Sequence, residues 1–197
     1  MGRVAGAGNC DQVKEVVNQL SSGGSTTCFG IIDWDLVNNE TGQVFVLGHQ
    51  VRYSLENFLL DPLAIAFFLL RERFKSRDQV GFADSEKYTD IPLFDKNRLQ
   101  NIVNDIESKV HAACGSPTIS GRTSQSYVGG VEIEISNWYL RHQGHQLETA
   151  LKSSFPELNR FRGEFDLKRK ILQTIFTDHA EFIPKGIPDL LRRIQHA

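Results

Sequence analysis

The sequence predicts a mixed α/β domain with a parallel sheet and an added helical C-terminal portion, and three observations support this prediction. Residues 26–35 begin as an apolar run with β-branched residues, which is typical of a buried strand in a parallel sheet. Residues 13–20 place valine and leucine on one face at helical spacing. Residues 2–8 form a short Gly-rich segment with strand character. We therefore expect a strand–helix–strand unit whose two strands run parallel.

The next segments continue this alternation of strands and helices. A second strand is expected at 43–47, after a turn at 38–42. Ser54 can cap a short helical turn, and Asp61 with Pro62 at the first helical position opens a longer helix. That helix is apolar around most of its circumference, so we expect it to be buried.

The rest of the chain is predicted to be mainly helical. Four helices are expected to begin at Asp95, about Gly144, Asp166 and Pro188. Residues 131–135 alternate strictly between apolar and acidic side chains, which predicts a half-buried strand with both glutamates facing solvent. Polar loops are expected at 75–94 and 114–130.

The composition is ordinary for a soluble globular protein, with 197 residues, 40% hydrophobic and 23% charged. The longest apolar run, 58–70, is too short to cross a membrane, and the N-terminus lacks the apolar core of a signal peptide. The three cysteines show no metal-binding spacing, so we expect reduced thiols in a cytoplasmic protein. A net charge of −2 argues against non-specific coating of nucleic acid, but it allows an enzyme that reaches phosphates through a metal.

Two acids one residue apart, Asp33 and Asp35, end the apolar run. Ligands of open α/β sheets collect beyond the carboxyl ends of the strands, and alternate residues of a strand face the same way. Carboxylate oxygens suit Mg²⁺ or Mn²⁺, which take one or two carboxylates together with phosphate oxygens and water. The alternative is that both acids merely begin a polar loop, and the sequence leaves the two interpretations open.

A second polar pair, Glu56 and Asn57, lies at the end of the strand-to-helix connection that begins at Tyr53. Glu56 either belongs to the N-terminal cap of the short helix or reaches the site of Asp33 and Asp35. Asn57 is the neighbouring candidate for binding water or substrate.

Further candidates for contacts with phosphate are Gly8 and His145. Gly8 ends the Gly-rich N-terminal segment, which is similar to a phosphate-binding turn but fits a tight strand-to-helix turn better. His145 lies at a helix entry, where an imidazole or a backbone N–H can meet a phosphate, although an ordinary surface histidine fits equally well. The basic residues of 160–170, Lys168 among them, favour a solvated helix face over a phosphate-binding track.

Together, residues 29–35, the second strand and residues 53–60 resemble the TOPRIM-like (topoisomerase–primase) proteins. The resemblance is to a family of unknown-function proteins that act with an ATPase in bacterial anti-phage defence, such as the nuclease effector of the PARIS system. The overcoming-lysogenization-defect nucleases share the metal site. Residues 138–147 also resemble a C-terminal motif of that group.

This resemblance implies a TOPRIM/Rossmann-like core in residues 1–75, completed by a helical insertion and C-terminal helical portion in residues 76–197. It implies that Asp33 and Asp35 hold Mg²⁺ or Mn²⁺, that Glu56 shares in catalysis, that the substrate is nucleic acid and that an ATPase is a partner. The sequence departs from the family in one respect, because the glutamate expected on a strand before the Gly-rich segment is missing. We therefore expect either a piece of a longer polypeptide or a domain with an incomplete catalytic site.

Two other functions fit parts of the sequence. Residues 33–37 fit the nucleophile loop of haloacid-dehalogenase-like phosphatases, in which the first aspartate is phosphorylated and the second is the acid/base. That fold places the loop after its first strand and needs a late acidic pair, which this sequence lacks. The other alternative is a non-catalytic module that binds an ATPase partner or nucleic acid.

Overall fold

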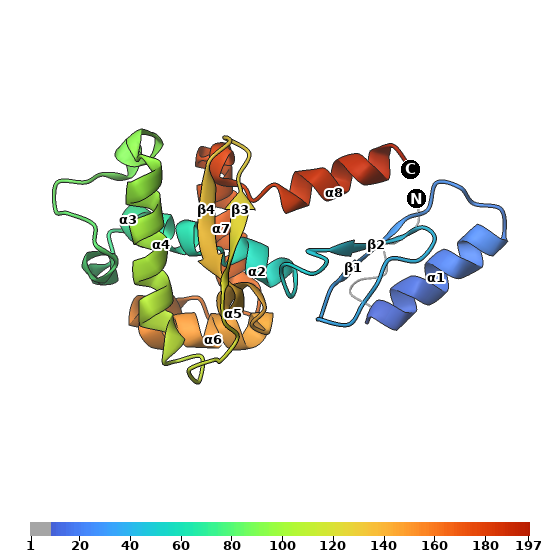
Figure 1. Ribbon diagram of the computed structural model, residues 1–197, viewed down its shortest axis with the longest axis horizontal. Helices are drawn as coiled ribbons and strands as arrows, with labels where there is room; N and C mark the ends of the chain where they lie inside the picture. The colour runs from blue at the N-terminus through green and yellow to red at the C-terminus, as the bar shows by residue number, and fades with distance from the viewer. Residues whose placement is uncertain (1–8) are drawn as a thin grey trace.

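The computed structural model describes residues 9–197, which form a helical body and a smaller N-terminal unit (Figure 1). The predicted mixed α/β class is confirmed, and helices outweigh strands. The elements in chain order are α1 (Cys10–Ser22), β1 (Gly30–Asp33), β2 (Val44–Leu47), α2 (Leu55–Leu59), α3 (Pro62–Arg71), η1 (Lys75–Val80), η2 (Tyr88–Leu93), α4 (Lys96–His111), β3 (Arg122–Ser126), β4 (Glu132–Ser136), α5 (Asn137–Leu140), α6 (Gly144–Ser154), η3 (Pro156–Arg160), α7 (Asp166–Asp178), η4 (Ala180–Phe182) and α8 (Gly186–Gln195). The strand predicted at 2–8 lies outside the described residues.

The N-terminal unit is a parallel pair of strands held between two helices. β1 pairs with β2 in parallel, with Gly30 opposite Val44 and Asp33 opposite Leu47. Both strands were expected from the sequence, but the parallel partner predicted for β1 was the segment at 2–8, which lies outside the described residues. Helix α1 packs on one face of the pair and α8 packs on the other face, over β2 (Figure 1). The expectation that β1 is buried on both faces is wrong, because α8 leaves Ile31 at the middle of the strand 44% exposed.

The helical body is built around α3, and every residue from Pro62 to Leu70 is buried, as predicted. Asp61 caps this helix by accepting a hydrogen bond from the Leu63 amide at 3.0 Å. Helices α4 and α7 pack on α3, and α4 begins where Asp95 accepts from the Arg98 amide. Helix α3 lies within residues 1–75, which we expected to form the TOPRIM-like core, but it packs in the same hydrophobic core as the C-terminal helices.

The hairpin of β3 and β4 corrects one sequence expectation. Strand β4 and its outward glutamates were predicted, but β3 lies inside the stretch 114–130 that we expected to be a loop. The two strands pair antiparallel, with Arg122 opposite Ser136. The sequence of β3, Arg-Thr-Ser-Gln-Ser, lacks apolar alternation because the side chain that it buries, Gln125, is polar.

A fully buried ion pair between Arg52 and Asp61 joins the β3–β4 hairpin to α2 and α3. Arg52 Nη2 lies 2.7 Å from Asp61 Oδ2, and neither side chain is exposed. The same guanidinium donates to the Asn57 carbonyl at 2.6 Å and to Gln125 Oε1 at 3.1 Å. The Tyr127 hydroxyl completes the network 3.0 Å from each Asp61 oxygen. This network therefore ties α2, α3 and β3 together.

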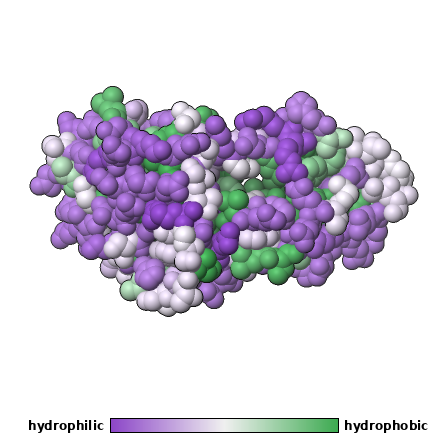
Figure 2. All heavy atoms as spheres, viewed as in Figure 1, coloured by the Kyte–Doolittle hydropathy of each residue, from purple (hydrophilic) through white to green (hydrophobic). Residues whose placement is uncertain are grey.

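The surface of the helical body is mainly hydrophilic on the face shown in Figure 2, and apolar side chains are more evident around the N-terminal unit. No helix within residues 9–197 has both the length and the apolar character that crossing a membrane requires.

We expect Asp61→Asn to lower the free energy of unfolding by about 3 kcal/mol, because it leaves the buried Arg52 without a countercharge while keeping the size of the side chain. Urea unfolding at neutral pH measures this loss. The matched control is Asp189→Asn, since Asp189 pairs with Arg192 on the surface, and we expect a change below about 0.5 kcal/mol there. Equal effects of the two variants would contradict a central role for the buried pair.

Candidate carboxylate site

The candidate site begins where β1 ends at Asp33. The chain leaves the strand in a tight turn in which Asp35 (φ 48°) and Leu36 (φ 63°) both adopt left-handed backbone conformations. Non-glycine residues adopt this region at a cost of about 1 kcal/mol each, and such residues cluster at functional sites. The Asp35 amide donates to the Tyr53 carbonyl at 2.9 Å, which anchors the turn against the segment that leads into α2.

The N-terminus of α2 is joined directly to Asp33. The amide of Leu55, the first residue of α2, donates to Asp33 Oδ1 at 2.8 Å. Among the described residues no other hydrogen bond to the Asp33 carboxylate is present, so its second oxygen is available to a ligand. This contact places Glu56, the next residue of α2, beside the two aspartates.

Glu56 and Asp35 lie close enough to Asp33 to affect its ionisation. Burial raises the pKa of Asp33 from its usual value of 3.8 to about 6, and the neighbouring charges of Glu56 and Asp35 add to this rise against the Leu55 hydrogen bond. Burial and the charge of Glu56 also raise the pKa of Asp35. The structure thus brings together Asp33, Asp35 and Glu56, which the sequence analysis proposed as one site.

Glu56 differs from the aspartates because polar partners hold its charge. Burial opposes its ionisation, but the Ser54 hydroxyl, the backbone, Lys168 and His145 outweigh burial and lower its pKa. The Ser54 hydroxyl donates to Glu56 Oε2 at 2.7 Å. Glu56 lies in the first turn of α2, where Ser54 and Asn57 form the capping box, and its charge acts on both aspartates.

Lys168 is a site residue that the sequence analysis placed on a solvated helix face, and this expectation is wrong. Its side chain is 3% exposed, and its Nζ lies 3.8 Å from Glu56 Oε1 and 3.0 Å from Glu148 Oε2. Neither carboxylate is aligned to accept a hydrogen bond from this ammonium group. The helical period contained the signal, because Lys168 precedes the buried Ile171 by three residues and Ile175 by seven.

Helix α6 begins at Gly144, as the sequence predicts, and this helix start packs against Glu56 at the site. A Cβ at Gly144 would lie 2.6 Å from Glu56 Cβ and 2.8 Å from Ser54 Oγ, so only glycine fits there. His145 is exposed at the edge of the site, and its Nε2 lies 4.0 Å from Glu164 Oε1. Its charge, when protonated, acts on Glu56.

Asn57 has a structural role, in place of the substrate contact expected from the sequence. Its side chain is fully buried. The amide nitrogen donates to the carbonyls of Tyr139 and His142 at 3.2 and 2.9 Å, and Oδ1 accepts from Ser54. These contacts leave no accessible surface for substrate. The other proposed phosphate contact, Gly8, lies outside the described residues.

The donor set fits a hard divalent cation that keeps most of its water. Within residues 9–197, no group of three or more histidine, cysteine or acidic side chains is gathered tightly enough to hold a metal by itself. Mg²⁺ does not require such a cage, because it is bound in proteins by one or two carboxylates and completes its shell with water and phosphate oxygens. Asp33 and Asp35 supply two carboxylates at the end of β1, and Glu56 adds a third negative charge beside them.

We expect Asp33→Asn to stabilise the metal-free protein at pH 7.5 by about 1 kcal/mol, after allowance for solvent screening. The folded protein favours protonated Asp33, so its contribution to stability is full below pH 3.8 and is lost as the pH rises through about 6. Thermal unfolding with a chelator should therefore show a higher midpoint for Asp33→Asn at pH 7.5. The difference should shrink towards pH 4.5, and a difference that does not depend on pH would contradict this assignment.

Gly144→Ala should lower the free energy of unfolding by about 1–3 kcal/mol, because its methyl group would overlap Ser54 and Glu56. Urea unfolding measures this loss. Gly115→Ala is the control, because a Cβ at this left-handed glycine meets nothing within 4 Å. We expect only the backbone strain of about 1 kcal/mol there, and a larger loss at Gly115 would argue against close packing as the cause.

Comparisons with protein-family models, with curated proteins and with solved structures gave no match for this chain.

Proposed function

We propose that this chain is a metal-dependent nuclease domain of TOPRIM type that hydrolyses phosphodiesters in nucleic acid. The observation that supports the proposal is the convergence of Asp33, Asp35 and Glu56 where β1 ends, from two segments fixed to each other by the Leu55 amide. Proteins with open parallel sheets commonly bind their ligands at the carboxyl ends of the strands. In a metal-dependent nuclease, a cluster of carboxylates binds the divalent cation. The bound cation offsets the negative charge of the carboxylates, so that the phosphodiester anion can approach.

Asp33 and Asp35 would hold Mg²⁺ or Mn²⁺ in this proposal. A bound divalent cation would polarise a phosphoryl oxygen and stabilise the charge that develops during an in-line displacement. The Leu55 amide holds one oxygen of Asp33 in place, and the left-handed turn fixes the backbone at Asp35. These restraints position the two carboxylates before a ligand arrives, which lowers the reorganisation needed on binding.

The neighbours of the aspartates set the charge of the site. Ser54 and Lys168 favour the ionised form of Glu56, so that this carboxylate attracts cations while Asp33 still holds a proton near pH 6. His145 is exposed at the edge, where its imidazole can donate to a phosphate oxygen. The resemblance seen in the sequence extends the proposal to an ATPase partner in anti-phage defence and to a cytoplasmic location.

We expect the purified chain to cleave labelled DNA or RNA with Mg²⁺ or Mn²⁺ and to lose this activity with a chelator. Asp33→Asn should reduce cleavage to background without lowering thermal stability, whereas Asp189→Asn should cleave normally because Asp189 is an exposed residue of α8 that pairs with Arg192. Gel analysis of end-labelled strands measures both.

Three other outcomes would contradict this proposal or favour a different function. Full cleavage by Asp33→Asn would show that this residue is not part of the nuclease site. Turnover of a small phosphomonoester that depends on Asp33, without strand cleavage, would favour the phosphatase alternative. Binding without any turnover, unchanged in Asp33→Ala/Asp35→Ala, would favour the non-catalytic module.

A further inference from the structure

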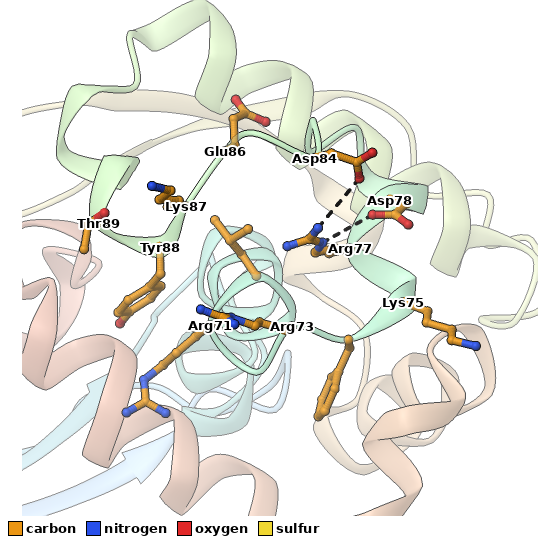
Figure 3. Close-up of a pocket in the computed structure, with 12 residues that line it drawn as sticks. Arg71, Arg73, Lys75, Arg77, Asp78, Asp84, Glu86, Lys87, Tyr88 and Thr89 are labelled. Atoms are coloured by element: carbon orange, nitrogen blue, oxygen red, sulfur yellow. Dashed lines mark hydrogen bonds and ion pairs between the residues drawn. The ribbon is translucent and has the colours of Figure 1, made fainter.

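A hollow of about 590 Å³ lies at the C-terminal end of α3, at the opposite end of that helix from the carboxylate site. Five cationic side chains line it, one from the last residue of α3, three from residues 73–77 and one from the residue that precedes η2. They are Arg71, Arg73, Lys75, Arg77 and Lys87, and Figure 3 shows them around the hollow. Because α3 has ten residues, about 15 Å of helix separate the two regions.

Most of this positive charge is not neutralised. Among the described residues, Arg73, Lys75 and Lys87 form no ion pair, since no acidic oxygen lies within 4.0 Å of their side-chain nitrogens. Arg77 pairs with Asp78 and Asp84 at the surface, where ion pairs contribute little (Figure 3).

The third acidic residue of the hollow is occupied elsewhere. Both oxygens of Glu86 accept hydrogen bonds from Arg98, at 2.9 and 2.7 Å. Arg71 is the cation with the closest acidic partners, Glu72 at 2.8 Å and Asp178 at 3.5 Å. The hollow therefore holds several like charges that repel one another, and an anion would relieve this repulsion.

Arg73 adds a second observation that is independent of charge. Its amide donates to Leu70 O and the Phe74 amide donates to Leu69 O, both at 3.1 Å, which is the Schellman pattern that ends α3. Arg73 occupies the left-handed position of this pattern, with φ 53°, where glycine is usual. Backbone strain of this kind in a non-glycine residue is found more often at functional sites than elsewhere.

We infer that this hollow binds the phosphate groups of an unpaired nucleic-acid strand. Cations in a groove beside an aromatic ring are the combination that single-strand binding uses, and Tyr88 lines the same hollow. Cations near a helix C-terminus also interact with the helix dipole, but this applies to Arg71 and Arg73 and leaves Lys75 and Lys87 unexplained. The inference goes beyond the proposed function, because binding here does not require cleavage at the carboxylate site.

Fluorescence anisotropy of a labelled oligothymidylate, measured with a chelator over a range of salt concentrations, tests this inference. The variant Arg73→Gly/Lys87→Gln removes two cations and places the usual glycine in the turn. We expect its affinity to fall about tenfold and its salt dependence (the slope of log K against log salt) to weaken by about 1.4, from two lost phosphate contacts. Its thermal midpoint should not fall, because glycine relieves the backbone strain.

The matched control is Lys109→Gln/Arg192→Gln, which removes two exposed cations from α4 and α8 and should bind as the unchanged chain does. Equal loss of affinity in both double variants, or no loss in the hollow variant, would overturn the inference. Tripolyphosphate binding is measured in parallel. If the hollow variant loses tripolyphosphate binding but still binds oligothymidylate, the inference is overturned and the hollow is a site for a small polyphosphate. Binding through the hollow by a chain that cleaves nothing would refute the nuclease proposal and leave this inference standing.

Discussion

The buried pair of Arg52 and Asp61 is the constraint on which the arrangement of the molecule depends. Replacing a buried ion pair by apolar residues is often harmless, but removing one partner is strongly destabilising, so such a pair fixes geometry more than it adds stability. Here the guanidinium reaches the carbonyl of Asn57 in α2, the cap of α3 and Gln125 in β3. The position of α2 is thereby set from the helical body.

The carboxylate site lies where the two parts of the molecule meet. The aspartates come from the N-terminal unit, whereas Glu56 and Lys168 come from α2 and α7. The Leu55 amide and the contact between Gly144 and Glu56 join these contributions. Helix α8 adds a second connection, because Leu190 packs with Leu47 of β2 and Arg193 pairs with Glu40 at 2.7 Å. These contacts connect the unit that supplies the aspartates to the helical body that supplies Glu56 and Lys168.

The sequence predicted the features that depend on local rules. Caps and apolar spacing identified α3 and α4, and the end of an apolar run identified Asp33 and Asp35, because these signals lie within a few neighbouring residues. The sequence did not reveal β3, whose strand is stabilised by its partner β4 and by burial of Gln125. The buried roles of Asn57 and Lys168 were not predicted either, since Asn57 binds carbonyls more than 80 residues away and Lys168 lies between carboxylates of two other helices, Glu148 of α6 and Glu56 of α2.

The raised pKa of Asp33 has an evolutionary consequence. A protein that did not need this carboxylate would gain stability from almost any neutral replacement of similar size, and such replacements are easily reached by mutation. A counter-ion would reverse the balance, because a ligand that binds only the folded state raises its stability by an amount that grows with the logarithm of the ligand concentration over the dissociation constant. The Asp33 carboxylate thus lowers the stability of the chain without a ligand, and the same carboxylate would allow a bound cation to raise it.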